Sequence, residues 1–249
     1  MELLSILLIL IAGIIAGFLN VIAGGGTLLT MPILIFLGLP SAVANGTNRV
    51  ALTVQNIVAV LNFKKYGYFD WKLGVLLGIP ALFGSIIGSM LAISIPDEIF
   101  NKILAVTMLL ILGLILWQPE KKFKAYMEKL TLKRKIIAVI VFFFIGIYGG
   151  FIQAGVGFII MASLTLITGL SLVKINSLKV FIVLVYMIVS LGIFIFNGQV
   201  NWLYGFILAI GSGIGAWMGS KFSVKKGDKW IRIFLVITVS LMSISLFIK

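Results

Sequence analysis

Long apolar stretches alternate with short polar segments along the whole chain. The apolar stretches cover residues 3–22, 27–38, 43–63, 73–93, 99–117, 136–154, 158–170, 174–196, 202–220 and 230–248. A helix needs about 20 apolar residues to cross the hydrocarbon core of a bilayer, so most of these stretches are long enough to span it. The stretches 27–38 and 158–170 are too short for a straight crossing. The pattern therefore predicts an all-α polytopic membrane protein in which two passes are half-length.

The longest polar segment divides this apolar pattern into two halves. It contains most of the residues from Pro119 to Lys135 and is rich in lysine. We therefore expect a first transmembrane repeat at residues 1–118, a basic cytoplasmic linker at 119–135 and a second transmembrane repeat at 136–249.

The second half matches the first without a gap at an offset of 131 residues. The segment 23–26, Ala-Gly-Gly-Gly, aligns with the segment 154–157, Ala-Gly-Val-Gly. Other identical pairs are Gly38 and Gly169, Asn45 and Asn176, Gly67 and Gly198, Trp71 and Trp202, Gly84 and Gly215, and Gly88 and Gly219. Matches at glycine, asparagine and tryptophan arise by chance less often than matches at Leu or Ile in an apolar chain. The offset therefore indicates an internal duplication.

Corresponding loops of the two halves differ in charge. The loop at 64–72 is basic, whereas its counterpart at 197–199 is uncharged. The loop at 95–98 is acidic, whereas its counterpart at 221–229 is rich in lysine. Because basic loops stay on the cytoplasmic side, corresponding loops are expected on opposite sides. This predicts two inverted-topology repeats of about five passes each, with four long helices plus one broken or half-length helix per repeat.

The distribution of lysine and arginine favours ten passes over eight. With ten passes and an outside N-terminus, only Arg49, Lys102 and Lys249 of the 20 basic residues lie away from the cytoplasmic side. If each short stretch merely extended the helix before it, the basic residues would divide almost evenly between the sides. We therefore expect a multi-pass protein of the cell membrane, embedded in the lipid bilayer, with both termini outside.

The composition excludes several classes of protein. The chain is 61% hydrophobic and 11% charged, whereas a soluble domain is about 25% charged. It contains no Cys and no His, which excludes disulfides, the common metal and haem sites, and Cys/His or Ser/His catalytic sets. We expect no enzyme activity, no metal and no cofactor. The net charge of +13 fits cytoplasmic loops, and no nucleic-acid partner is expected. The sequence leaves the oligomeric state open, including a homo-oligomer.

A glycine-rich break interrupts an apolar segment in each half. The candidate binding residues at the breaks are Gly24, Gly25, Gly26 and Thr27 in the first half, and Gln153, Gly155 and Gly157 in the second. Unpaired backbone at this depth is tolerated only inside protein or beside a water-filled cavity. The half-helix that follows each break presents N–H groups and a positive dipole end, which suit an anion. We therefore predict an anion site near the membrane midplane. The alternative is that the glycines only permit tight helix crossing.

A polar cluster with one cation follows each half-length helix. These candidate binding residues are Asn45, Thr47, Asn48 and Arg49 in the first half, and Asn176, Ser177 and Lys179 in the second. Spacings of three and four residues place most of them on one helix face. We expect them to face the same anion, the alternative being helix capping with the cations reaching the interface. All seven acidic residues fall in loops or at chain ends, which disfavours a cation exchanger or a proton relay.

The segment 17–26, followed by Pro32 and by Ala-Asn-Gly-Thr at 44–47, resembles the TauE/SafE family of membrane transporters, the sulfite exporter and toluene-sulfonate permease group. The likeness extends over nearly the whole chain, including the duplicated halves and the basic central loop. It implies transport of a small anionic substrate such as sulfite or an organosulfonate. Val156 stands where the first half has Gly25, so the two breaks are not equivalent. A non-transporting membrane protein with a structural, lipid-binding or partner-binding role is the alternative.

Overall fold

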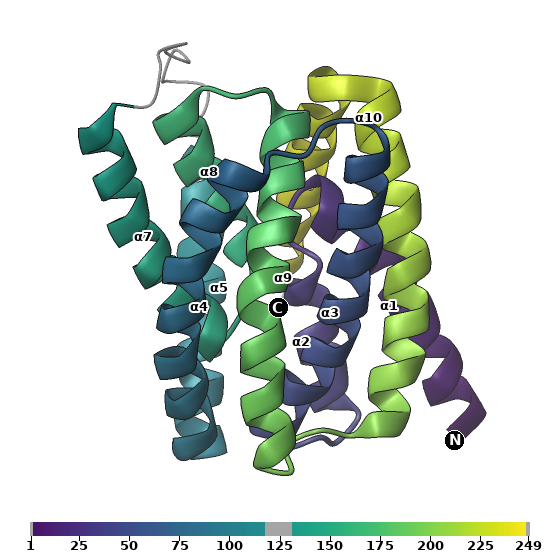
Figure 1. The fold of residues 1–249 in the computed structure, drawn as a ribbon. Coiled ribbons are helices and arrows are strands. Elements are labelled where there is room, and N and C mark those ends of the chain that lie inside the picture. Colours follow the sequence, from purple (N-terminus) through teal and green to yellow (C-terminus); the bar gives the residue numbers. More distant parts are fainter. Residues whose placement is uncertain (1, 118–130, 248–249) are drawn as a thin grey trace.

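The computed structural model describes residues 2–117 and 131–247, which form nine helices and, over these residues, no strand. In chain order they are α1 (Glu2–Ile22), α2 (Thr27–Phe36), α3 (Ser41–Lys65), α4 (Trp71–Ser94), α5 (Asp97–Trp117), α7 (Leu132–Phe151), α8 (Val156–Thr168), α9 (Leu172–Phe196) and α10 (Trp202–Phe247). They stand roughly side by side in one bundle (Figure 1). The prediction of an all-helical fold is confirmed.

The last helix contains a sharp bend. At Gly227 the backbone leaves helical geometry, with φ 73° and ψ −171°, and glycine alone adopts such a positive φ at no steric cost. Figure 1 shows the chain turning back near this end of α10. With the bend counted, each half has the same order: a long helix, a half-length helix and three further long segments.

The predicted linker at 119–135 is described only in its last residues. Residues 118–130 lie outside the described part of the chain. The Thr131 side chain accepts a hydrogen bond from the Arg134 N–H, and α7 begins at Leu132. Residues 132–135 therefore belong to a helix and not to the linker, because an N-cap threonine allows a helix to start before its apolar stretch does.

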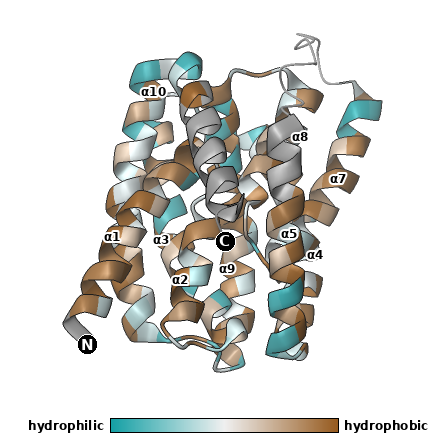
Figure 2. Cartoon of the chain, turned by 180° about the vertical axis from the view of Figure 1, so that it is seen from behind, coloured by the Kyte–Doolittle hydropathy of each residue, from teal (hydrophilic) through white to brown (hydrophobic). Residues whose placement is uncertain are grey.

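Five helices of the described chain are long and apolar enough to cross a membrane by length and composition. Their apolar spans are Leu4–Ile22, Trp71–Ser94, Leu132–Phe151, Leu172–Phe196 and Trp202–Ile231. Helices α2 and α8 are apolar but have only 10 and 13 residues. Helix α3 has 25 residues, and it buries asparagine, glutamine and arginine side chains along its length. Elsewhere, hydrophilic residues lie mainly near the two ends of the bundle (Figure 2).

The two halves of the chain are interleaved. Helix α1 packs along α10 and helix α4 packs along α7, so the tightest helix pairs join one half to the other. These pairs correspond at the offset of 131 residues. A Cβ atom added to Gly215 would lie 2.1 Å from the Ile14 carbonyl oxygen, and one added to Gly84 would lie 2.0 Å from that of Phe143. Small residues therefore let the backbones of both pairs approach closely.

Corresponding hydrogen bonds hold the start of the third helix in each half. The Ser41 N–H donates to Asp97 Oδ1 at 3.1 Å at the start of α3. The Val173 N–H donates to Asp228 Oδ1 at 3.2 Å at the start of α9. Asp97 and Asp228 are themselves 131 residues apart. The halves therefore share local contacts as well as the order of their helices.

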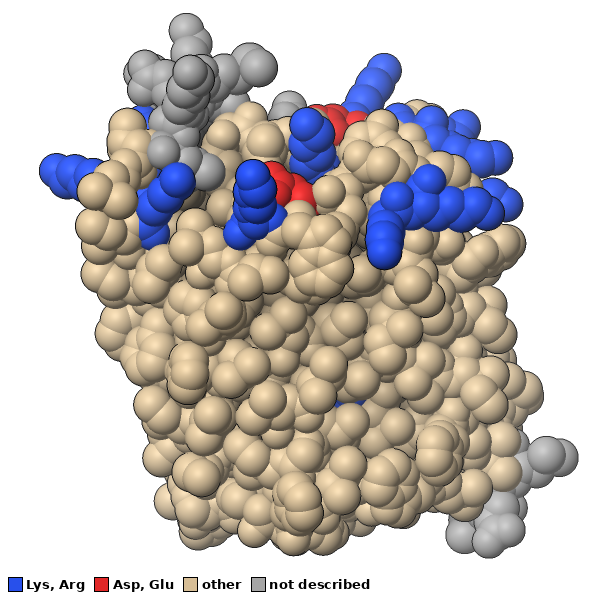
Figure 3. Space-filling view, viewed as in Figure 1, with Lys and Arg blue, Asp and Glu red and all other residues tan. Residues whose placement is uncertain are grey.

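Basic side chains gather at one end of the bundle. Figure 3 shows lysine and arginine at the upper end of the visible face. Figure 1, in the same orientation, places the α3–α4 connection at this end and the α9–α10 connection at the opposite end, with the N-terminus. Exposed lysines of the α3–α4 connection, the start of α7 and the α10 bend are Lys64, Lys65, Lys72, Lys133, Lys135, Lys225, Lys226 and Lys229. We call this surface the basic end.

Candidate functional site

The two glycine-rich breaks meet inside the bundle. Gly24 and Gly155, which correspond at the repeat offset, have φ values of 89° and 69°. A Cβ atom added to Gly157 would lie 2.3 Å from the Gly24 Cα atom, closer than real Cβ contacts come. The close approach of the two backbones therefore requires glycine at these positions.

Thr27, the first residue of α2, joins the two breaks. Its hydroxyl donates to the Gln153 carbonyl oxygen at 3.2 Å and accepts from the Gly155 N–H at 3.1 Å. Gln153 has a left-handed backbone with φ 65°, unusual for a residue other than glycine. Its side-chain oxygen accepts from the Tyr186 hydroxyl at 2.7 Å. The predicted break residues thus form one connected structure.

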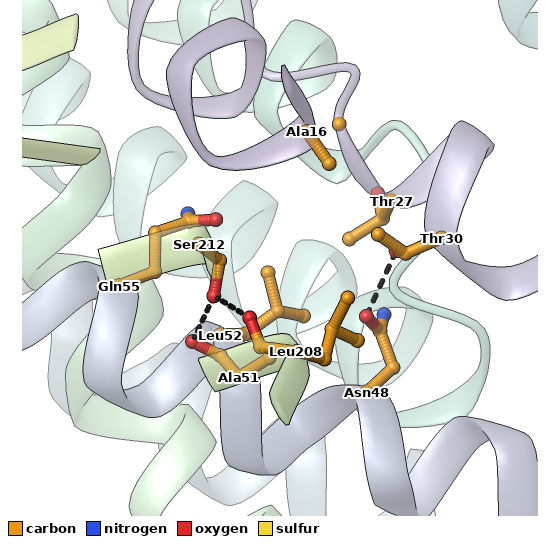
Figure 4. A pocket seen from close by; sticks show the side chains of 10 residues that line it. Ala16, Thr27, Thr30, Asn48, Ala51, Leu52, Gln55, Leu208 and Ser212 are labelled. Atoms are coloured by element: carbon orange, nitrogen blue, oxygen red, sulfur yellow. Dashed lines mark hydrogen bonds between the residues drawn. The ribbon is translucent and has the colours of Figure 1, made fainter. Parts of the chain in front are cut away.

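A small cavity lies beside the first break, between α1, α2, α3 and α10. It is lined by Ala16, Gly26, Thr27, Thr30, Asn48, Ala51, Leu52, Gln55, Leu208 and Ser212. Its volume, taken for the centre of a water-sized sphere, is about 10 Å³, which corresponds to roughly one water molecule. Figure 4 shows the α2 threonines on one side, and Gln55 and Ser212 on the other. We call this space the first-break cavity.

Two amide groups of α3 direct unpaired donors at this cavity. Thr30 Oγ1 donates to Asn48 Oδ1 at 2.8 Å, which leaves the Asn48 NH₂ group as the free end of the side chain (Figure 4). Neither Asn48 Nδ2 nor Gln55 Nε2 has a hydrogen-bond partner among the described residues. Both side chains are buried, with 1% and 2% of their residue surface exposed. A buried donor without an acceptor is costly, so its presence in a cavity indicates a ligand rich in acceptors.

Arg49 follows Asn48 in the sequence but binds the end of α7. Its guanidinium donates to Ser190 Oγ at 2.6 Å, the Gly149 carbonyl at 3.3 Å, the Gly150 carbonyl at 2.5 Å and Asn45 Oδ1 at 3.1 Å. Asn45 also donates to the Phe151 carbonyl at 2.7 Å. The last carbonyls of α7 form the negative end of that helix, so a cation is favourable there. Arg49 is fully buried.

Lys179 makes the matching arrangement in the second half. Its ammonium donates to the Asn20 carbonyl at 2.9 Å, the Val21 carbonyl at 2.8 Å and Asn176 Oδ1 at 2.8 Å. Asn176 also donates to the Ile22 carbonyl at 3.2 Å. An Asn–cation pair on one half therefore binds the carbonyl end of the broken helix of the other half, twice. These contacts are a form of helix capping across the halves, and direct contact of Arg49 or Lys179 with an anion stays a prediction.

The remaining predicted residues are buried near the breaks or at one helix start. Gly25 lies inside the first break, where its carbonyl accepts from the Leu28 N–H at 3.1 Å. Thr47 accepts from the Asn201 N–H at 2.9 Å, beside the α9–α10 connection. Ser177 Oγ is buried and has no partner in the described part of the chain. Of all the predicted residues, Gly26, Thr27 and Asn48 line the first-break cavity.

Three polar lining residues were absent from the predicted set: Thr30, Gln55 and Ser212. A signal for Gln55 exists in the sequence, because Asn48, Gln55 and Asn62 follow at intervals of seven residues and so share a face of α3. The Asn62 amide donates to Ser220 Oγ at 2.8 Å on α10, near the basic end. Thr30 and Ser212 lie in apolar helices and give no comparable signal.

Comparison with known proteins decides the family. The family model described as sulfite exporter TauE/SafE matches residues 9–246. The chain belongs to the TauE/SafE family. The resemblance seen in the sequence is thereby confirmed, and the TauE/SafE assignment describes a membrane transporter and not an enzyme.

Curated relatives agree with the TauE/SafE assignment. A probable membrane transporter protein of Haemophilus influenzae is 31% identical over 93% of this chain and 90% of its own length. The probable membrane transporter protein YfcA of Escherichia coli is 30% identical, over 93% of this chain and 86% of its own length. One from Sinorhizobium, ORF9, is 26% identical over 95% and 90%. No solved structure gives a significant match. The chain is a multi-pass membrane transporter.

Proposed function

We propose that this TauE/SafE protein is a secondary transporter of small anions, with sulfite, organosulfonates and related sulfur oxyanions as its substrates. The observation that carries the proposal is the pair of unpaired amide donors, Asn48 Nδ2 and Gln55 Nε2, in the first-break cavity. An oxyanion offers several acceptors to such donors. The N-terminus of α2, at Gly26 and Thr27, adds a positive dipole end on the same side.

Neutral donors hold the anion in this proposal, and the two buried cations supply positive charge from nearby. Arg49 and Lys179 have their donors on oxygen atoms of the protein. Those oxygens are uncharged, so the positive charge of both residues remains uncompensated inside the bundle. In surroundings of low dielectric constant such charges stabilise an anion without touching it.

We further propose that the two halves are inverted repeats, with the basic end facing the cytoplasm and both termini outside. The offset of 131 residues, the matching Asp97 and Asp228 contacts, and the opposite ends reached by the α3–α4 and α9–α10 connections support this arrangement (Figure 1). The first-break cavity is smaller than sulfite. Binding therefore requires the surrounding helices to move apart, as expected for alternating access around a site at a repeat interface.

The decisive experiment is sulfite uptake into proteoliposomes, compared with protein-free vesicles. The double variant Asn48→Leu with Gln55→Leu keeps the side-chain volume but removes both donors. Each hydrogen bond to a charged ligand contributes about 1.5–3 kcal/mol, so we expect the anion affinity to fall by roughly 100-fold or more. Asn56→Leu is the matched control, because Asn56 is buried on α3 but donates to the Leu52 carbonyl of its own helix. Equal affinity in the double variant and wild type would overturn this site.

A second candidate function, a non-transporting membrane protein that binds lipid or a partner, is favoured by the basic end (Figure 3). Lysines on such a surface attract anionic headgroups. Folded protein that carries no sulfite, sulfonate, thiosulfate or carboxylate, yet clusters anionic lipid, would support this second function over transport.

A further inference from the structure

The ammonium of Lys179 lies in a shell of three oxygen atoms that the transport site does not use. Two are main-chain carbonyls of Asn20 and Val21, in the last turn of α1, and the third is Asn176 Oδ1. The three N–O distances lie between 2.8 and 2.9 Å, and an ammonium has three donors. Each donor therefore has one acceptor, and the side chain is 2% exposed.

This shell is uncharged, which sets Lys179 apart from an ordinary buried ion pair. A buried cation without a carboxylate partner is expensive in a membrane protein, and such residues are retained where they have a function. The favourable term here is the carbonyl end of an interrupted helix, which carries partial negative charge. In transporters, carbonyls at the ends of broken helices are the usual ligands of a coupling cation.

The shell also lies close in sequence to the proposed anion site. Asn20 and Val21 end α1, and the chain then passes through the glycine break to Gly26 and Thr27, which line the first-break cavity. A cation on the carbonyl end of α1 therefore fixes the segment that presents the positive end of α2 to the anion. Loss of that cation would loosen the break and weaken anion binding together.

We propose that the Lys179 ammonium occupies a cation site at the end of α1, and that this tethered cation takes the place of a mobile sodium ion. The cation site stands on the contacts of Lys179 alone, whereas the sodium independence rests on the proposed transport function. Anion transport by the wild-type protein then requires no sodium, because the positive charge at the break is part of the chain.

The cation site is tested by thermal unfolding of the purified, detergent-solubilised protein in sodium, methylammonium or choline chloride. Lys179→Ala keeps the three oxygens but removes the ammonium, so a free cation can enter. A ligand at about 100 times its Kd stabilises the folded state appreciably, and we expect sodium or methylammonium to raise the Tm of Lys179→Ala by about 5 °C over choline. The wild-type Tm should be the same in all three salts.

Two matched variants separate a cation site from a general loss of packing. Lys179→Met keeps an unbranched side chain that fills the space, so its Tm should not respond to the cation. Lys174→Ala removes an exposed lysine from the same helix and should behave as wild type. If Lys179→Ala is not recovered in folded form, Lys179→Ser, which adds one more oxygen, replaces it. A folded small-residue variant with the same Tm in every salt would overturn the cation site.

Sulfite flux in proteoliposomes tests the role in transport. Wild-type flux should be unchanged when choline replaces sodium on both sides, whereas Lys179→Ala should regain most of its lost flux with sodium or methylammonium. Wild-type flux that requires sodium would overturn the proposal that Lys179 replaces a mobile ion. A cation-dependent Tm without flux in any protein would overturn the role in transport and the proposed function, and would leave the cation site standing.

Discussion

The two halves use the same scaffold, but only the first forms a polar cavity beside its break. The lining positions and their counterparts at the repeat offset are Thr27 and Phe158, Thr30 and Met161, Asn48 and Lys179, Gln55 and Tyr186, Ser212 and Ala81, and Ala16 and Ile147. Nearly every polar or small residue of the first half is replaced by a larger or apolar one in the second. The space that forms the first-break cavity is thus filled with side chains in the other copy.

This difference teaches that duplication conserved the framework and not the site. The framework consists of the two breaks, the Asn–cation pairs and the capping aspartates, and it is present in both halves. The unpaired amide donors of Asn48 and Gln55 are found in one half, because their counterparts are Lys179, whose donors are all used, and Tyr186, whose hydroxyl binds Gln153. A transporter of this design needs one anion site between two supporting repeats.

The largest expected effect comes from separating the two breaks. In Gly157→Leu, the new side chain would start 2.3 Å from the Gly24 Cα atom, and neither backbone can move without disturbing α2 or α8. We expect no folded protein, measured as loss of the monodisperse peak in size-exclusion chromatography. Gly192→Leu is the control, since a Cβ atom there meets nothing within 4 Å. Normal recovery of Gly157→Leu would show that the breaks do not touch in the membrane.

Exchanging the residues that differ between the breaks should affect the halves unequally. Gly25→Val places in the first break the residue that Val156 supplies in the second. We expect at least about a 100-fold loss of flux with the fold intact, because the added side chain keeps the anion away from the backbone beside Gly26. Val156→Gly should transport normally and be less stable, since Val156 is 2% exposed. Equal flux in the two variants would remove the functional difference between the breaks.

The two cations can be compared through the charge and the shape of Arg49. Arg49→Met removes the positive charge near Asn48, and we expect anion affinity to fall about 30-fold, or 2 kcal/mol. Arg49→Lys keeps the charge but cannot reproduce the planar fork that binds Gly150 and Ser190. Its affinity should change less than about threefold while its Tm falls. Isothermal titration and thermal unfolding measure both. Affinity that falls equally in both variants would indicate that the guanidinium contacts the anion directly.

The smallest expected effect on transport comes from single cysteines that report topology. The chain contains no cysteine, so labelling of a new one has no background. Asn197→Cys, at the α9–α10 connection, should react with an impermeant maleimide on intact cells. Lys225→Cys, at the basic end, should react only after permeabilisation, and flux should be unchanged in both. Labelling of the two sites from the same side would exclude the proposed inversion.

The sequence by itself determined the segments and the duplication. Hydrophobic length identified the long helices, and the glycine clusters at 24–26 and 155–157 located the breaks, because both signals are local. The two short stretches were found as α2 and α8, and the polar segment before residue 230 matched the bend at Gly227. The offset between the halves required only identities such as Asn45 and Asn176.

Only the tertiary structure decided which groups face one another. Arg49 and Lys179 bind main-chain carbonyls of the opposite half, and a carbonyl has no sequence signature. The cavity joins Thr30 of α2, Gln55 of α3 and Ser212 of α10, three helices whose rotation about their axes is set by packing. Sequence spacing gives the face of a helix that a residue shares with its neighbours. The partner of that face depends on how the other helices pack against it.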